Sequence, residues 1–406
     1  MLHEPERHEA LASVAWDEGV ARDAIEDIVR DTEGRFSEDA YWPLHPKDVE
    51  PGDDPSQPAL PLYHGAAGVI WALRYLHQVG AAPGARRTTE QLDALLLRNR
   101  AWLASMPGNE SAAFMMGDTP ILLMAQGERP TDERADRLAA LIEGNLDHPA
   151  RELMWGAPGT MLAASFLHER FGDARWAELF RRTAARLWSQ LQWSDEHGCH
   201  HWSQDLYGRR STYLDAVHGF VATARALLHG RRLLDAGDWA AWEQVIATTI
   251  GRTATREGRM ASWPAQLALQ GDAPYPRLMQ FCHGAPGFVI CLAELPGPTL
   301  DELLLAAGEA TWAAGPLCKG SNLCHGTGGN GYAFLTLHAR TGDALWLHRA
   351  RAFAMHGILQ TKEDARRYGQ LRYSLWTGDL GFAIYLWDCI RAKPAFPTLD
   401  VFYPPA

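Results

Sequence analysis

The sequence has few cysteines, no long apolar run and no excess of basic residues. Its 406 residues include only 6 Cys. No stretch approaches the ~20 consecutive apolar residues of a transmembrane helix. Lys and Arg number 38 against 49 Asp and Glu, which gives a net charge of −11. These features argue against a disulfide framework and a membrane span. They also argue against nucleic-acid binding, which needs clustered positive charge.

The N-terminus lacks the basic start and the apolar core of a secretory signal. Residues 1–28 instead alternate charged residues with Ala and Leu. We therefore expect a cytoplasmic protein with reduced thiols, whose functional cysteines are metal ligands or nucleophiles. Apolar residues make up 47% of the chain, which is ample for a large buried core.

A short glycine phrase recurs seven times, each time directly before an apolar segment. Five copies have two glycines three residues apart, and two copies lack the second glycine. The first glycines are Gly65, Gly117, Gly156, Gly219, Gly284, Gly326 and Gly378. Their spacings of 52, 39, 63, 65, 42 and 52 residues each allow one helix, a turn and a returning helix.

The segments between these phrases have the period of amphipathic helices. In residues 173–192, one face carries Trp176, Leu179, Phe180, Leu187 and Leu191. The segments directly after the glycines are apolar on nearly all sides and predict buried helices. Little period-two alternation disfavours strands. We predict an all-α fold, an α/α toroid (a double-layered α-barrel) of about seven helical hairpins, with an outer ring around an inner ring.

Two parts of the chain are expected to form one globular domain. Residues 1–60 make an N-terminal helical segment and loop, and the Pro- and Asp-rich stretch 45–61 is predicted to be exposed. Residues 61–406 make the toroid. Glycine at the start of each inner helix allows close backbone approach and leaves N–H groups facing the centre of the ring.

Two glycine phrases carry a Cys-His pair directly before the glycine, Cys282-His283 and Cys324-His325. Cys and His are the usual ligands of Zn²⁺, and a helix N-terminus favours the thiolate form. Two pairs at the same repeat position predict one metal site between adjacent inner helices. Four ligands would make a closed structural site, whereas three would leave a position open for catalysis.

The other cysteines have simpler interpretations. Cys291 and Cys389 lie in apolar helical segments and are predicted to belong to the core. Cys318 is out of phase with the repeat and is not expected to be a ligand. Cys199 lies in a His-rich stretch that is predicted to be a polar loop.

The phrases FCHGAPG and LCHGTGGN, within seven glycine repeats, resemble the lanthionine synthetase C-like family of LanC and LanC-like proteins. The resemblance covers roughly residues 60–390. It implies seven inner and seven outer helices around one zinc ion, with Cys282, Cys324 and His325 as ligands. The fourth position would take water or the substrate thiol, and His283 would not bind the metal. The first phrase is closer to the glutathione-binding LanC-like branch than to the lantibiotic cyclases.

The same resemblance implies four catalytic residues. His218, in LDAVHGF, matches the acid/base histidine, and Glu152, in ELMWG, matches an acidic residue near it. Arg277 and Lys319 each precede a zinc cysteine by five residues and match basic residues of the family. Arg277 departs by one residue from the cyclase pattern.

The implied reaction is zinc-dependent thioether formation, the Michael-type addition of a thiol to dehydroalanine or dehydrobutyrine. The thiol is either a peptide cysteine, which gives a lanthionine ring, or glutathione. The expected partner is a dehydrated peptide or protein. Because the sequence begins near the toroid, ring formation would need a separate dehydratase.

Other classes of function compete with this one. A non-catalytic zinc- and glutathione-binding sensor or scaffold would keep the metal site. A zinc prenyltransferase toroid uses a different ligand set, terpene cyclases need Asp-rich motifs that we do not find, and toroid glycosidases use two carboxylates without zinc.

Overall fold

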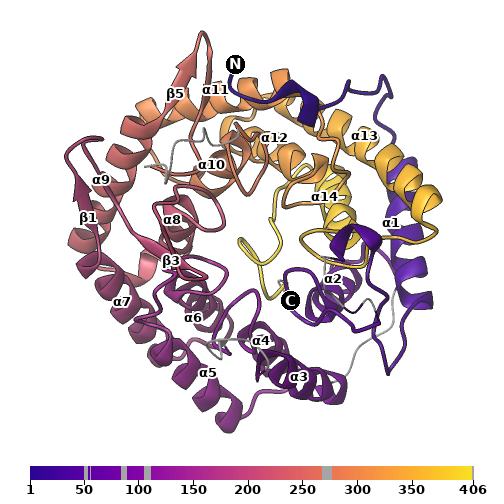
Figure 1. Cartoon of the computed structure of the whole chain (residues 1–406), viewed down its shortest axis with the longest axis horizontal. Coiled ribbons are helices and arrows are strands. Elements are labelled where there is room, and N and C mark those ends of the chain that lie inside the picture. Colours follow the sequence, from indigo (N-terminus) through magenta and orange to yellow (C-terminus); the bar gives the residue numbers. More distant parts are fainter. Residues whose placement is uncertain (50–53, 55, 84–88, 105–110, 268–276, 405–406) are drawn as a thin grey trace.

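A computed structural model of the chain shows helices arranged in two concentric rings (Figure 1). It describes residues 1–49, 54, 56–83, 89–104, 111–267 and 277–404. The inner ring consists of α2 (Ala66–Gln78), α4 (Thr119–Glu128), α6 (Ala157–Phe171), α8 (Phe220–His229), α10 (Ala285–Leu292), α12 (Thr327–Thr341) and α14 (Asp379–Arg391). The outer ring consists of α1 (Glu18–Gly34), α3 (Thr89–Ala104), α5 (Asp132–Gly144), α7 (Ala174–Ser189), α9 (Ala236–Thr253), α11 (Pro298–Ala314) and α13 (Ala344–Tyr368). The predicted α/α toroid is confirmed.

The two rings differ in burial as their sequences predict. Each inner helix follows one of the seven glycine phrases, and in α10 every residue is buried. Outer helices bury one face only. In α7 the buried face includes Trp176, Leu179, Phe180 and Leu187, while the arginines lie on the exposed side. Among the helices that the structure describes, none has the length and apolarity to cross a bilayer.

The N-terminal segment contributes a helix to the outer ring. Helix α1 packs beside α14 and also contacts α13, so the first helix in the sequence lies next to the last (Figure 1). Its buried face includes Ala21, Ile25 and Ile28. The ring is therefore closed by residues from opposite ends of the chain.

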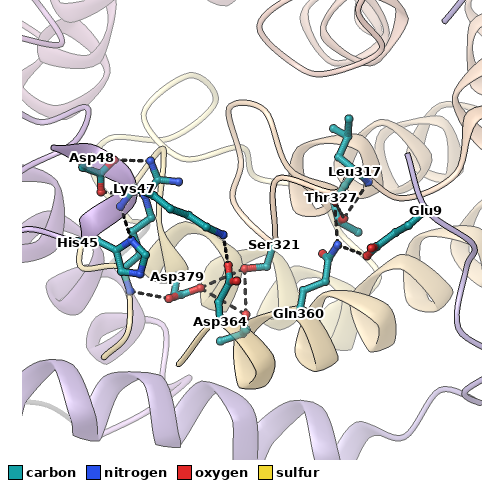
Figure 2. Close-up of polar contacts among 12 residues, drawn as sticks. Glu9, His45, Lys47, Asp48, Leu317, Ser321, Thr327, Gln360, Asp364 and Asp379 are labelled. Carbon is teal, nitrogen blue, oxygen red and sulfur yellow. Dashed lines mark hydrogen bonds and ion pairs between the residues drawn. The ribbon is translucent and has the colours of Figure 1, made fainter. Parts of the chain in front are cut away.

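Short 3₁₀-helices, η1 (Pro5–Arg7) and η2 (Pro46–Asp48), flank α1 in the N-terminal segment. Figure 2 shows Lys47 facing Asp364 of α13, with which it forms an ion pair. Asp48 accepts a hydrogen bond of 2.8 Å from Arg372 Nε. His45, expected in an exposed loop, is instead buried under these contacts. Residues 50–53 and 55 of that predicted loop lie outside the described residues.

Three small antiparallel hairpins occupy the two longest spacings between glycine phrases. They pair β1 (Gln192–Ser194) with β2 (Cys199–His201), β3 (Gln204–Leu206) with β4 (Arg209–Ser211), and β5 (Thr255–Glu257) with β6 (Met260–Ser262). A third 3₁₀-helix, η3 (Arg231–Leu233), follows α8. Cys199, predicted in a polar loop, is fully buried in β2. Strands of three residues are too short to carry a recognisable alternation.

The C-terminal segment runs into the centre of the ring (Figure 1). Phe396 and Phe402 are buried there, and the ring of Phe396 stacks on that of Phe281 at 4.6 Å between centroids. Asp400 forms an ion pair of 2.7 Å with Arg225 of α8. Phe281 directly precedes Cys282, so the C-terminal segment packs against the residue next to a predicted metal ligand.

The second glycine of a phrase packs tightly against its own loop and against the loop of a neighbouring repeat. A Cβ atom on Gly159 would lie 2.1 Å from the carbonyl oxygen of Leu153 and 2.7 Å from Cβ of Phe114. Gly287 has the same environment, 2.1 Å from the carbonyl oxygen of Phe281. No other residue fits these positions without moving the backbone.

We predict that Gly159→Ala lowers the free energy of unfolding by roughly 1–3 kcal/mol, because the added methyl group overpacks the core. Gly144→Ala is the matched control, since nothing lies within 4 Å of a Cβ at Gly144. That helical position should gain up to roughly 1 kcal/mol from the better helix propensity of Ala. Urea unfolding of both variants measures the difference, and equal stabilities would contradict the close-contact role of Gly159.

Candidate metal and catalytic site

A chain of backbone hydrogen bonds links the loops that precede the inner helices. In most of these loops, the residue two positions before the first glycine donates its N–H to the carbonyl at the same position of a neighbouring loop. The bonds are Cys282 to Cys324 (3.0 Å), Cys324 to Trp376 (2.9 Å), Trp376 to Tyr63 (3.1 Å), Tyr63 to Met115 (3.1 Å) and Met115 to Met154 (3.2 Å). This register places Cys282 and Cys324 side by side, although they lie in different repeats.

The three predicted metal ligands come together at this point. One ligand atom each of Cys282, Cys324 and His325 lies within 4.8 Å of the other two. Both cysteines are buried, and His325 is half-buried. Two sulfur donors and one imidazole form a set typical of zinc, with room for a fourth ligand.

The two sulfur atoms have further polar neighbours. Tyr63 Oη donates to Cys324 Sγ, and Gln280 Nε2 donates to Cys282 Sγ, each at 2.9 Å. A hydrogen bond from the Cys282 thiol, with His325 nearby, holds the pKa of Cys324 well below its usual range. The same bond raises the pKa of Cys282. Cys324 is therefore the more acidic thiol of the pair, and the hydrogen bonds from Tyr63 and the Cys282 thiol stabilise its negative charge.

Glu152 and His218 form a carboxylate–imidazole pair in the neighbouring repeats. His218 Nδ1 donates to Glu152 Oε2 at 2.9 Å, while Oε1 accepts from the backbone N–H of Trp155 at 2.6 Å. Burial alone would lower the pKa of His218. The hydrogen bond and charge of Glu152, with the charges of Asp215 and Cys324, outweigh burial and raise that pKa to about 9. His218 is therefore an imidazolium at neutral pH, and 23% of its side chain is exposed.

A second carboxylate–imidazole pair, Asp215 with His283, was not predicted. Oδ1 of the fully buried Asp215 accepts from the backbone N–H of Val217 (2.9 Å) and of His218 (2.7 Å). Its Oδ2 lies 2.9 Å from Nδ1 of His283. Burial acts to raise the pKa of Asp215, but the charge and hydrogen bond of His283 lower it overall.

A positional signal for Asp215 was present in the sequence. Asp215 stands four residues before the first glycine of its phrase, as Glu152, Gln280 and Asn322 do in theirs. At each of these positions a polar side chain hydrogen-bonds its own loop. Comparing this position between repeats would have identified Asp215 as a loop-stabilising carboxylate.

The two predicted basic residues are placed differently. Arg277 is exposed, and its Nη1 donates to the carbonyl oxygen of Met1 at 2.7 Å. Its backbone N–H donates to Glu4 Oε1 at 3.2 Å, so Arg277 is tied to the N-terminal segment. Lys319 is exposed on the loop before α12. The roles assigned to these two residues stay predictions.

The remaining cysteines are placed as predicted, apart from Cys199. Cys291 and Cys389 are fully buried within α10 and α14, and Cys318 is exposed.

The site thus combines a Cys₂His cluster with two carboxylate–imidazole pairs. Helices α8, α10 and α12 begin directly after these loops, and their positive N-terminal ends favour negative charge there.

Comparisons with known proteins agree with this architecture. Residues 58–401 match the family model described as lanthionine synthetase C-like protein. The chain is 34% identical over 359 residues to glutathione S-transferase LANCL1 of Danio rerio, which spans 84% of each protein. It is 40% identical over 137 residues to LanC-like protein GCL1 of Arabidopsis thaliana, which spans 32% of this chain and 31% of that protein.

A solved structure of nisin cyclase has the same fold, with a TM-score of 0.55 and 13% identity. The alignment covers 92% of this chain and 100% of that one. The family match takes in every inner helix and each of the three predicted metal ligands. The chain therefore belongs to the lanthionine synthetase C-like family.

Proposed function

We propose that the protein adds a thiol to a dehydroalanine or dehydrobutyrine residue and forms a thioether. The supporting observation is the Cys₂His cluster beside an imidazolium held by a buried carboxylate. In this reaction the S–H bond of the thiol breaks and a bond forms between sulfur and the β-carbon. The α-carbon takes up one proton, and no oxidant or reductant is needed.

The donor set of the cluster fits zinc. Two cysteine sulfurs and one imidazole favour zinc over magnesium and calcium, which prefer oxygen ligands. Cys282, Cys324 and His325 would hold the ion. Bound zinc supplies a lowered pKa for a thiol ligand, so that the thiol substrate reacts as a thiolate at neutral pH.

His218 has the properties of the proton donor. It carries its proton at neutral pH because Glu152 stabilises the imidazolium. Its positive charge also favours the negative charge that develops on the substrate carbonyl oxygen during addition. Asp215 accepts hydrogen bonds from the backbone of Val217 and His218, and so fixes the loop that carries the acid.

Glutathione is the thiol that the comparisons favour. The zebrafish relative, named a glutathione S-transferase, matches 84% of this chain at 34% identity. Nisin cyclase is similar in fold alone, at 13% identity. We therefore assign glutathione as the thiol and a dehydrated peptide or protein as its acceptor.

The function is tested by incubating the zinc-loaded protein with glutathione and a dehydroalanine peptide. We expect one zinc per chain by elemental analysis, and a peptide heavier by one glutathione by mass spectrometry. Cys324→Ala should lose zinc and activity, whereas Cys318→Ser, an exposed control, should keep both. An intact zinc content with no adduct, together with glutathione binding measured by calorimetry, would instead support a non-catalytic zinc- and glutathione-binding protein.

The pH dependence of kcat tests the role of His218. Its raised pKa means that the imidazolium is present below pH 9 and is lost as the pH rises through about 9. We expect kcat to fall above that pH. Glu152→Gln removes the stabilising charge, so the fall should move down by at least about one pH unit. The exposed Glu143→Gln is the control. An unchanged profile in Glu152→Gln would assign the titration to another group.

A further inference from the structure

The turn between β3 and β4 carries a residue that its backbone conformation disfavours. Tyr207 and Gly208 are its two central residues, and both have positive φ, +55° and +75°. Two-residue hairpin turns of this kind favour Asn-Gly or Asp-Gly, because a bulky side chain is strained at positive φ. Strained residues of this kind cluster at functional sites.

Tyr207 reaches back to the catalytic loops. Although the residue is 78% exposed, its hydroxyl accepts a hydrogen bond of 2.9 Å from Trp155 Nε1. The two rings meet edge to face, 6.2 Å apart. Trp155 directly precedes Gly156, the same repeat position that His218 and His325 occupy in their loops.

Hydrogen bonds of the side chain and of the backbone of Trp155 link Tyr207 to the carboxylate that holds the acid. The Trp155 backbone N–H donates to Glu152 Oε1 at 2.6 Å, and His218 Nδ1 donates to Oε2 of the same carboxylate at 2.9 Å. An exposed aromatic ring is thus held three hydrogen bonds away from the proposed proton donor.

The hairpin is anchored to the rim of the site. In Figure 1, β3 lies in the part of the ring that contains α6 and α8, and the backbone N–H of Asp205 in β3 donates to the Pro149 carbonyl at 2.9 Å. Gln204 Oε1 accepts from the backbone N–H of Tyr213 at 2.8 Å. The ring of Tyr213 lies 5.8 Å from that of His218 and 6.2 Å from that of His283. The base of the hairpin therefore packs against the loops that carry both imidazoles.

We propose that the exposed ring of Tyr207, held in place by the buried Trp155, forms an aromatic shelf that binds the acceptor peptide beside its dehydroamino acid. This inference rests on the proposed function and names the feature of the acceptor that is recognised, an apolar or aromatic side chain flanking the reacting residue. Aromatic faces bind such side chains by burying apolar area. Glutathione has no apolar or aromatic side chain, so the shelf discriminates between acceptors and does not select the thiol.

The variant Tyr207→Asn separates this role from a structural one. Asn suits a turn with positive φ, so the melting temperature should stay the same or rise. The KM for a dehydroalanine peptide flanked by Phe should rise roughly fivefold, the loss of about one aromatic contact. For a Gly-flanked peptide the KM should change less than twofold, as should kcat and the KM for glutathione. Trp193→Ala, an exposed aromatic on β1, is the matched control.

Two results would overturn the shelf. One is an unchanged KM for the Phe-flanked peptide in Tyr207→Asn, and the other is an equal rise in KM for the Gly-flanked peptide. If the wild-type protein forms no adduct, the proposed reaction fails. The shelf is then tested by fluorescence anisotropy with a labelled Phe-flanked peptide. A several-fold weaker Kd in Tyr207→Asn supports it, and an equal Kd overturns it.

Discussion

The site depends on how closely neighbouring inner helices approach each other at their N-terminal ends. A Cβ atom on Gly287 would lie 2.6 Å from Cβ of Ala216, and one on Gly329 would lie 3.1 Å from Cβ of Phe281. Because these residues are glycines, the loops of adjacent repeats come near enough for backbone hydrogen bonds. The bond from Cys282 N–H to the Cys324 carbonyl, 3.0 Å long, is one of them. The three candidate metal ligands come together because the backbones of their loops are hydrogen-bonded to each other.

The functional side chains occupy three positions of these loops, four, two and one residues before the first glycine. The residue four before the glycine stabilises the loop, and in two repeats this carboxylate also holds the imidazole of the next repeat, as Glu152 does for His218. In most loops the residue two before the glycine takes part in the chain of backbone hydrogen bonds between loops. In two loops this residue is a candidate cysteine ligand. The residue directly before the glycine is a histidine in several repeats, among which His218 and His283 pair with carboxylates and His325 joins the cysteine cluster. The repeated loops therefore share one backbone arrangement, and the site arises from the different side chains at equivalent positions of these loops.

Much of this arrangement could be predicted because the glycine phrase is both local and repeated. It identified the seven inner helices and predicted that the two Cys-His pairs meet, and the family resemblance then selected Cys282, Cys324 and His325 as ligands. Contacts between distant segments left no such signal. The position of α1 beside α14, and the bond from Arg277 to Met1, depend on tertiary packing that no sequence period encodes. The hairpins were missed because strands of three residues are too short. The Asp215–His283 pair was missed because the position four before the glycine was not compared between repeats, although Glu152 occupies it in the preceding repeat.

The charges of the site support one another. Against the effect of burial, Glu152 raises the pKa of His218 most, and the charges of Asp215 and Cys324 raise it further, to about 9. Hydrogen bonds from Tyr63 and the Cys282 thiol stabilise the negative charge of Cys324 in turn. In water a thiol loses its proton at a higher pH than an imidazolium does, so thiolate and imidazolium are seldom present together. Here burial beside opposite charges reverses that order. The charge of Cys324, a candidate metal ligand, therefore helps to keep His218 protonated at neutral pH.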